Sequence, residues 1–230
     1  MKNKAISYVF SISLIIVLFL SVIDLCCFDR AFYQREHRKL TLYDTPLAEY
    51  IGTDDEGLDH MTDVLLDYLK DKDRTLDLQM EIKGQMREIF TDDEKAHMVD
   101  VRELYLTAVM VRNVLLFVSV MSFAYLLWQE REKTFCYISG AYNRTLGITA
   151  IVLAALGVAI VSNFDAFWTS FHHVFFRNDL WLLDLAKDIL IMIVPPQFFN
   201  DLVIRIFITV VVTLLAFMGL FIFLRRRNEE

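Results

Sequence analysis

Four long apolar blocks constrain the fold of this chain more than any other feature. They cover residues 5–28, 104–128, 146–164 and 202–224. Each block is long enough to cross about 30 Å of hydrocarbon as a helix. The chain is therefore expected to be an all-α membrane protein with four transmembrane helices.

The basic residues of the short connecting segments predict its orientation. If the helices alternate, one side of the membrane receives Lys2, Lys4, Arg131, Lys133, Arg144 and the triplet Arg225, Arg226 and Arg227. Because lysine and arginine in short loops mark the cytoplasmic side, both termini are predicted to be cytoplasmic. The expected order is an N-terminal tail with helix 1 (1–28), an extracytoplasmic domain (29–103), helix 2 (104–128), a cytoplasmic loop (129–145), helix 3 (146–164), an extracytoplasmic loop (165–201), helix 4 (202–224) and a cytoplasmic tail (225–230).

The extracytoplasmic domain is expected to be mixed α/β. Apolar residues recur at helical spacing from Leu58 to Leu69, and Leu76 to Ile82 alternate with polar residues as in a strand. Lys83-Gly84 indicates a turn. Most acidic residues lie in this domain, and the net charge of −7 gives no reason to expect nucleic acid as a partner.

Two further segments have local predictions. Thr91-Asp92-Asp93-Glu94 has the pattern of a capping box, which predicts a helix starting near Asp92 and carrying His97 towards the second span. Leu182 to Val194 is too short to span a bilayer. It is expected to form an interfacial or re-entrant helix that Pro195-Pro196 ends.

The second span contains a charge that needs a partner. Arg112 lies well inside the apolar block, where an arginine is costly unless it pairs or reaches the surface. Asp24, in the first span, is the predicted partner in an ion pair between helices. Contact with a lipid or substrate head group is the alternative. In the third span, small residues around Gly157 are expected to permit close helix packing.

Histidines at one membrane surface are the candidate chemical groups. His97 precedes the second span, and His172-His173 follow the third within an aromatic frame. Alternating helices bring His97 and His172 to the outer surface at nearly the same depth. Such a pair can take and return a proton near neutral pH, with Asp100 orienting His97.

Other interpretations of the same residues stay open. Asn178 and Arg102 are candidate donors to an oxyanion. A metal site built from His97, His172 or His173 with Asp100 is one alternative, and plain interfacial anchoring is another. His37 and His60 have no carboxylate or aromatic frame and are expected to be surface residues.

Several short motifs together resemble a known family. They are Phe32-Tyr33, Glu94-x-x-His97-x-x-Asp100-Val101, Phe171-His172-x-x-Phe175-Phe176-x-Asn178-Asp179-x-Trp181 and Pro196-x-Phe198-Phe199. Their order and spacing relative to the spans resemble the bacterial lipoprotein intramolecular transacylase (Lit) family of four-helix membrane proteins. Leu185 departs from the pattern, which has a proline at this position.

The resemblance implies an enzyme of the cytoplasmic membrane whose active site is at the outer leaflet. Such enzymes move the sn-2 acyl chain of a diacylglyceryl-cysteine lipoprotein onto the α-amino group of the same cysteine. The product is a lyso-form, N-acyl-S-monoacylglyceryl lipoprotein, and neither a cofactor nor a metal is needed. The expected partners are a diacylated lipoprotein and membrane lipids. The implied catalytic pair is His97 and His172, with supporting residues Asp100, Arg102, Asn178, Tyr33 and His173.

Two other functions fit the same sequence. One is a metal-dependent membrane hydrolase that uses the same histidines. The other is a non-enzymatic membrane sensor or assembly factor whose outer segment binds a partner. His172 is chosen over His173 because adjacent residues of a regular element cannot both face one pocket.

Overall fold

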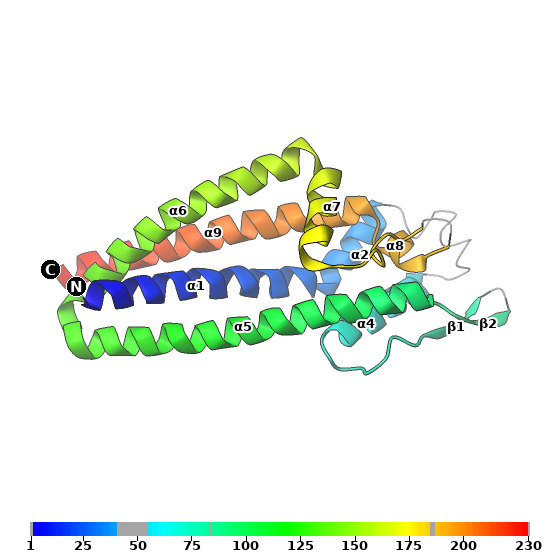
Figure 1. Cartoon of the computed structure of the whole chain (residues 1–230), viewed down its shortest axis with the longest axis horizontal. Helices are drawn as coiled ribbons and strands as arrows, with labels where there is room; N and C mark the ends of the chain where they lie inside the picture. Colours follow the sequence, from blue (N-terminus) through cyan, green and yellow to red (C-terminus); the bar gives the residue numbers. More distant parts are fainter. Residues whose placement is uncertain (1, 41–54, 83, 185–186, 230) are drawn as a thin grey trace. The chain divides into compact units, whose positions relative to one another are not determined.

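The computed structural model describes residues 2–40, 55–82, 84–184 and 187–229 (Figure 1). The chain forms two compact units. The first unit comprises Met1–Leu25, Ala108–Phe164 and Ile204–Glu230, and the second comprises Cys26–Thr107 and Asp165–Val203. The elements are α1 (Lys2–Cys27), α2 (Arg30–Lys39), α4 (Asp55–Leu69), β1 (Gln79–Ile82), β2 (Gln85–Glu88), α5 (Asp92–Glu130), the 3₁₀ turn η1 (Arg131–Lys133), α6 (Thr134–Ser162), α7 (Phe164–Phe175), α8 (Ile189–Ile193) and α9 (Pro196–Glu229).

Apolar helices make up the first unit. Within the described residues, three helical runs are long and apolar enough to cross a membrane: Lys2–Cys27, Asp92–Ser162 and Pro196–Asn228. The middle run comprises both α5 and α6, which the turn η1 joins. Large apolar side chains such as Phe117 and Ile151 are mostly exposed on these helices, as expected for surfaces that face lipid rather than water.

Specific side chains hold the helices of the first unit together. The Phe10 ring of α1 lies 5.8 Å from Phe123 of α5 and 6.0 Å from Phe221 of α9. A Cβ atom at Gly157 of α6 would meet the Phe207 ring of α9 at 3.0 Å, closer than ordinary van der Waals contact, so the glycine permits this close approach. The close packing predicted around Gly157 is therefore confirmed at this position.

The predicted ion pair inside the apolar helices is present. The Arg112 guanidinium donates to the Asp24 carboxylate at 2.8 Å, and both side chains are largely covered. Burying either charge alone in an apolar surrounding would cost several kcal/mol. The pair therefore fixes α1 against α5 within this unit.

Residues 129–145 are mostly helical, and the prediction of a loop there was wrong. Only the three residues of η1 separate α5 from α6. No proline interrupts this segment, and the Thr134 hydroxyl at the start of α6 donates to the Leu126 carbonyl of α5 at 3.0 Å, which ties the two helices together at the turn. Arg131 has a positive φ of 38°, so the chain reverses within a very short turn.

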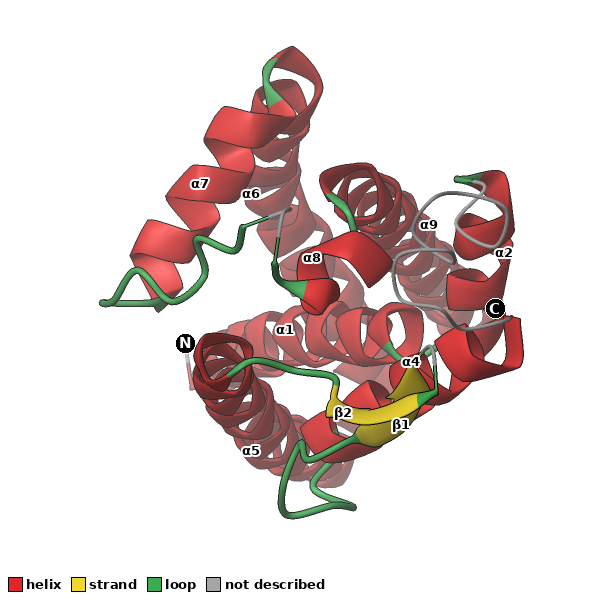
Figure 2. Ribbon diagram, turned by 90° about the vertical axis from the view of Figure 1, so that its right-hand side faces the viewer, coloured by secondary structure: helices red, strands yellow, loops and turns green. Residues whose placement is uncertain are grey.

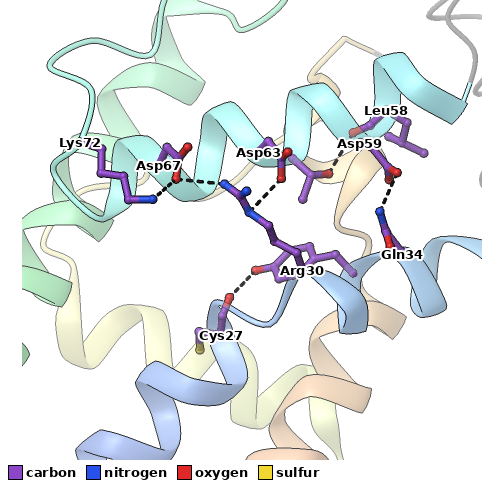
Figure 3. A network of polar contacts seen from close by, with 10 residues as sticks. Cys27, Arg30, Gln34, Leu58, Asp59, Asp63, Asp67 and Lys72 are labelled. Carbon is purple, nitrogen blue, oxygen red and sulfur yellow. Dashed lines mark hydrogen bonds and ion pairs between the residues drawn. The ribbon is translucent and has the colours of Figure 1, made fainter.

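The second unit packs α2 against α4 through a network of ion pairs. The Arg30 guanidinium lies between Asp63 and Asp67 of α4, at 3.0 Å from each, and Lys72 also contacts Asp67 (Figure 3). On the opposite face, α4 buries Met61 and several leucines at helical spacing, which confirms the predicted amphipathic helix.

A two-stranded antiparallel hairpin follows α4 (Figure 2). Gln79 pairs with Glu88, and Ile82 pairs with Gln85. Gly84 adopts a φ of 79° in the turn, a conformation that glycine reaches without steric cost. The predicted strand and turn are therefore correct, although the strand begins at Gln79 rather than at Leu76; Lys83 of the turn lies outside the described residues.

The helix expected over residues 182–194 is shorter than predicted. Within the described part of this segment, α8 covers only Ile189–Ile193. The Asp188 carboxylate accepts from the Asp184 amide at 2.7 Å, and this local bond competes with a regular helix. Pro196 then starts α9, which is consistent with the predicted end of the helix at Pro195-Pro196. Leu185 lies outside the described residues.

Candidate active site

The first turn of α5 positions His97. The Thr91 amide donates to Glu94 at 2.6 Å, and the Glu94 amide donates to the Thr91 hydroxyl at 3.3 Å. This is the predicted capping box. The other carboxylate oxygen of Glu94 accepts from the Leu190 amide of α8 at 2.5 Å. His97 follows Glu94 by three residues and is 7% exposed.

His172 is held by its own helix. Its Nδ1 lies 2.8 Å from the Trp168 carbonyl oxygen, one turn earlier on α7. A carbonyl oxygen only accepts, so Nδ1 carries the proton and Nε2 of the neutral ring has the lone pair. His172 is 6% exposed. The hydrogen bond to Trp168 therefore sets both the orientation and the tautomer of this imidazole.

The two histidines contact each other inside an aromatic shell. Their ring centroids are 6.1 Å apart. Phe176 lies against both rings, at 5.3 Å from His97 and 5.6 Å from His172. Trp181 stacks on His172 at 4.6 Å with the planes tilted by 25°, and Trp168 meets it edge-on at 4.8 Å.

Burial keeps both imidazoles neutral near pH 7. The pKa of His97 is lowered to about 4, chiefly by burial and also by His172, whereas Asp100 opposes the shift. Burial also lowers the pKa of His172, with the hydrogen bond to Trp168 acting in the opposite direction and His173 adding to the lowering. Two neutral rings can accept and donate protons, because each has one bare nitrogen and one N–H.

Asp100 and Asn178 form a link between α5 and the loop after α7. The Asn178 side chain donates to the Asp100 carboxylate at 2.8 Å, and its own oxygen accepts from the Leu180 amide at 3.2 Å. Asp100 acts on His97 through its charge, which raises the pKa of the imidazole. The predicted role of Asp100 in orienting His97 stays a prediction.

Arg102 and Tyr33 have structural partners. Arg102 pairs with Asp71 and lies 4.8 Å over the Tyr68 ring. Being five positions after His97, it is rotated from it by about 140° around the helix. The Tyr33 hydroxyl donates to the Cys27 carbonyl at 3.0 Å.

The structure distinguishes the two adjacent histidines. His172 is buried against His97, whereas His173 is exposed and meets the edge of Trp181 at 5.3 Å. His60 is exposed, as predicted, but the prediction of a surface position for His37 was wrong. His37 is fully buried, and its Nε2–H donates to the Ile193 carbonyl at 3.0 Å.

Of the two tryptophans of the site, Trp168 was not singled out from the sequence, and Trp181 was named only as part of a motif. Trp168 provides the carbonyl that fixes His172, and Trp181 provides the stacked ring. The position of Trp168 four residues before His172, on one helical face, is the signal that could have identified it. In the part of the chain that the structure describes, no three His, Cys, Asp or Glu side chains are grouped so as to hold a metal ion.

Comparisons with known proteins identify the family and the fold. The family model described as "Lipoprotein intramolecular transacylase Lit" matches residues 8–199. The membrane-integral lipoprotein intramolecular transacylase Lit from Bacillus cereus is 21% identical, with a TM-score of 0.79, covering 99% of this chain and 98% of that chain. Two structures of that protein with one histidine replaced, by arginine or by alanine, match with TM-scores of 0.74. The search of curated proteins finds no match.

At this identity the solved structures show a shared fold, and the family model covers most of the chain. The protein therefore belongs to the lipoprotein intramolecular transacylase Lit family.

Proposed function

We propose that this protein moves the sn-2 acyl chain of a diacylglyceryl-cysteine lipoprotein onto the α-amino group of the same cysteine. The observation that carries the proposal is the buried, neutral pair of His97 and His172, with ring centroids 6.1 Å apart, in a member of this family. The product is an N-acyl-S-monoacylglyceryl lipoprotein, the lyso form.

The reaction needs a group that handles one proton. The neutral amine attacks the ester carbonyl carbon, a C–N bond forms, and the C–O bond to the glycerol oxygen breaks. The proton leaves the amine nitrogen and reaches the glycerol oxygen, so atoms balance without water or a cofactor. Because donor and acceptor belong to one molecule, binding them in a reactive geometry removes much of the entropic barrier.

The tautomer of His172 supports its role as the base. Its Nδ1–H donates to Trp168, so Nε2 can accept the amine proton and then return it to the glycerol oxygen. The pKa of His97, lowered to about 4, keeps that ring neutral, so its N–H can donate to a substrate oxygen. Asp100 and Asn178 hold the loop after α7 near α5.

Other residues support this arrangement in the proposal. Arg102 and Tyr33 stabilise the second unit through the bonds described above. His173 contributes the contact with the edge of Trp181. None of the three needs to touch the reacting atoms.

We further propose that α1, α5, α6 and α9 cross the bacterial cytoplasmic membrane as four spans with both termini inside. The basic residues near the α5–α6 turn and at the C-terminal end of α9 support this orientation. In this orientation the histidine pair lies at the outer leaflet, at the level of the ester groups of a lipoprotein's diacylglyceryl-cysteine. The partners in this proposal are the diacylated lipoprotein and membrane lipids.

The test uses purified protein in micelles and a synthetic diacylglyceryl-cysteine lipopeptide, with no other protein. An O-to-N shift leaves the mass unchanged, so the readout is loss of reactivity with an amine-labelling reagent, with tandem mass spectrometry to locate the acyl chain. Conversion is expected with the unmodified protein. A substrate that keeps its free amine would contradict the proposal.

Three alanine variants separate the roles of the histidines. His97→Ala and His172→Ala are expected to lose at least about 10²-fold in rate, as for removal of an acid–base group. His173→Ala is the matched control and should stay within about threefold, because its side chain is exposed. A metal-dependent hydrolase would instead release free fatty acid, so that the lipopeptide loses mass. A chelator would stop this release.

A further inference from the structure

The indole N–H of Trp181 has no hydrogen-bond acceptor among the described residues, although the nitrogen is buried. Buried polar groups are bonded in the great majority of cases, so an exception beside a catalytic group needs an explanation. Stacking on His172 accounts for the position of the ring. It does not account for a buried donor whose hydrogen is unused.

A second buried atom beside the same ring lacks a partner. His97 Nδ1 has none in the described chain, and the His97 ring also contacts His172. Two unsatisfied polar atoms are thus carried by the two rings that neighbour the proposed base. This grouping is expected where a polar substrate binds and completes the hydrogen bonds.

Two other expected donors are engaged elsewhere. The Arg102 guanidinium pairs with Asp71; its Nε is also buried without a partner among the described residues, but Arg102 is rotated by about 140° from His97 around α5. The Tyr33 hydroxyl donates to the Cys27 carbonyl. The Trp181 N–H is a donor only, so it cannot take the amine proton and stays available throughout the reaction.

We propose that the Trp181 Nε1–H binds the carbonyl oxygen of the transferring acyl ester and stabilises the oxyanion that forms there. This rests on the acyl transfer proposed above. The Trp181 and His172 rings are nearly parallel, with centroids 4.6 Å apart. Stacking therefore places the indole directly beside the imidazole of the proposed base, where a base and an oxyanion donor can act on one tetrahedral centre.

The aromatic surroundings strengthen such a bond. Phe176 and Trp168 also lie against His172, so little water reaches this space. In a water-poor site a preorganised donor stabilises developing negative charge more than it does in bulk solvent. The bond is expected to be stronger to the oxyanion than to the ground-state ester, so it acts on kcat more than on KM.

The test replaces the N–H while keeping the ring. The sharpest variant carries 3-benzothienylalanine at position 181, in which sulfur stands for N–H, and Trp181→Phe is its genetically simple counterpart. Both are assayed on the synthetic diacylated lipopeptide. The expected result is a loss of about 10²–10³-fold in kcat, with KM within about twofold. Trp128→Phe, at a tryptophan that is 74% exposed outside the second unit, is the control and should match the parent.

The pH profile separates an oxyanion donor from a residue that acts through His172. If Trp181 acts on the carbonyl oxygen, the histidine slope of kcat/KM, expected well below pH 6.5, stays in place while kcat falls. A displaced histidine slope would show that Trp181 acts through His172 and would overturn the inference. A benzothienyl variant that unfolds like the parent yet keeps kcat within about threefold would also overturn it. An inactive parent protein would instead overturn the proposed acyl transfer.

Discussion

Glu94 offers a quantitative test of how the site is held, because one buried carboxylate serves two helices. Its two oxygens accept from the Thr91 amide at the start of α5 and from the Leu190 amide at the start of α8. The side chain has no exposed surface. Glu94→Gln keeps the shape but offers a single acceptor oxygen, so one backbone N–H then faces an NH₂ group.

Two effects of this substitution oppose each other. Losing a hydrogen bond to a charged acceptor costs about 1.5–3 kcal/mol. Burial raises the pKa of Glu94, which shows that the charge itself is costly there, and glutamine removes that cost. We expect a net loss of about 1–2 kcal/mol for Glu94→Gln, and about 3 kcal/mol or more for Glu94→Ala, which loses both bonds.

Hydrogen exchange at the Leu190 amide measures this loss locally. A loss of 1–2 kcal/mol corresponds to about 5–30-fold faster exchange where opening of α8 limits protection. Asp92→Asn is the matched control, because Asp92 is an exposed acidic residue of the same helical turn. Unchanged exchange at Leu190 in Glu94→Gln would refute the shared cap.

The pH dependence gives a second readout of the same carboxyl group. Its folded-state pKa is raised above the ordinary value of 4.5. The folded state therefore binds the proton more readily, and the contribution of this group to stability rises as the pH falls towards 4.5. Glu94→Gln should abolish this rise, as measured by thermal unfolding in micelles across that range.

Three further predictions follow from the described contacts. The acid limb of kcat/KM should follow the substrate amine, near pH 7.7–8.0. Because the pKa of His97 is lowered to about 4, this histidine should not add a second slope until well below pH 6.5. A histidine limb near pH 6.5 would contradict this expectation. Arg112→Gln should lower stability by about 1–3 kcal/mol, and adding Asp24→Asn should restore part of it in a double-mutant cycle of thermal unfolding. His37→Ala should lower the free energy of unfolding by about 2–4 kcal/mol, whereas exposed His60→Ala should change it by less than about 0.5 kcal/mol in the same measurement.

Local patterns in the sequence predicted much of the fold because each depends on nearby residues. The capping box at Thr91 and Glu94 and the turn at Gly84 are such cases. The ion pair between Asp24 and Arg112 was predictable because a charged side chain inside an apolar helix is costly unless an opposite charge pairs with it. The helix ends around residues 129–145 were not predictable, because the three residues of η1 include no proline or glycine that would mark the reversal.

The site was predicted in part. Topology and the motifs identified His97 and His172, and the choice of His172 over His173 agrees with their burial. The burial of His37 was missed, because its partner is a backbone carbonyl 156 positions away, a contact that no side-chain pattern reveals. The stacking of Trp181 was missed because it depends on how an irregular loop returns to α7.

The hydrogen bond from His172 to the Trp168 carbonyl has a consequence for how such a site tolerates mutation. In many enzymes a carboxylate side chain orients the histidine, and a single codon change can remove it. Here the acceptor is a peptide oxygen of the same helix, which every amino acid supplies. A substitution at position 168 therefore removes the indole ring that packs on His172 but keeps the hydrogen bond that orients the imidazole. A proline that breaks α7 is the kind of single change that would remove this hydrogen bond.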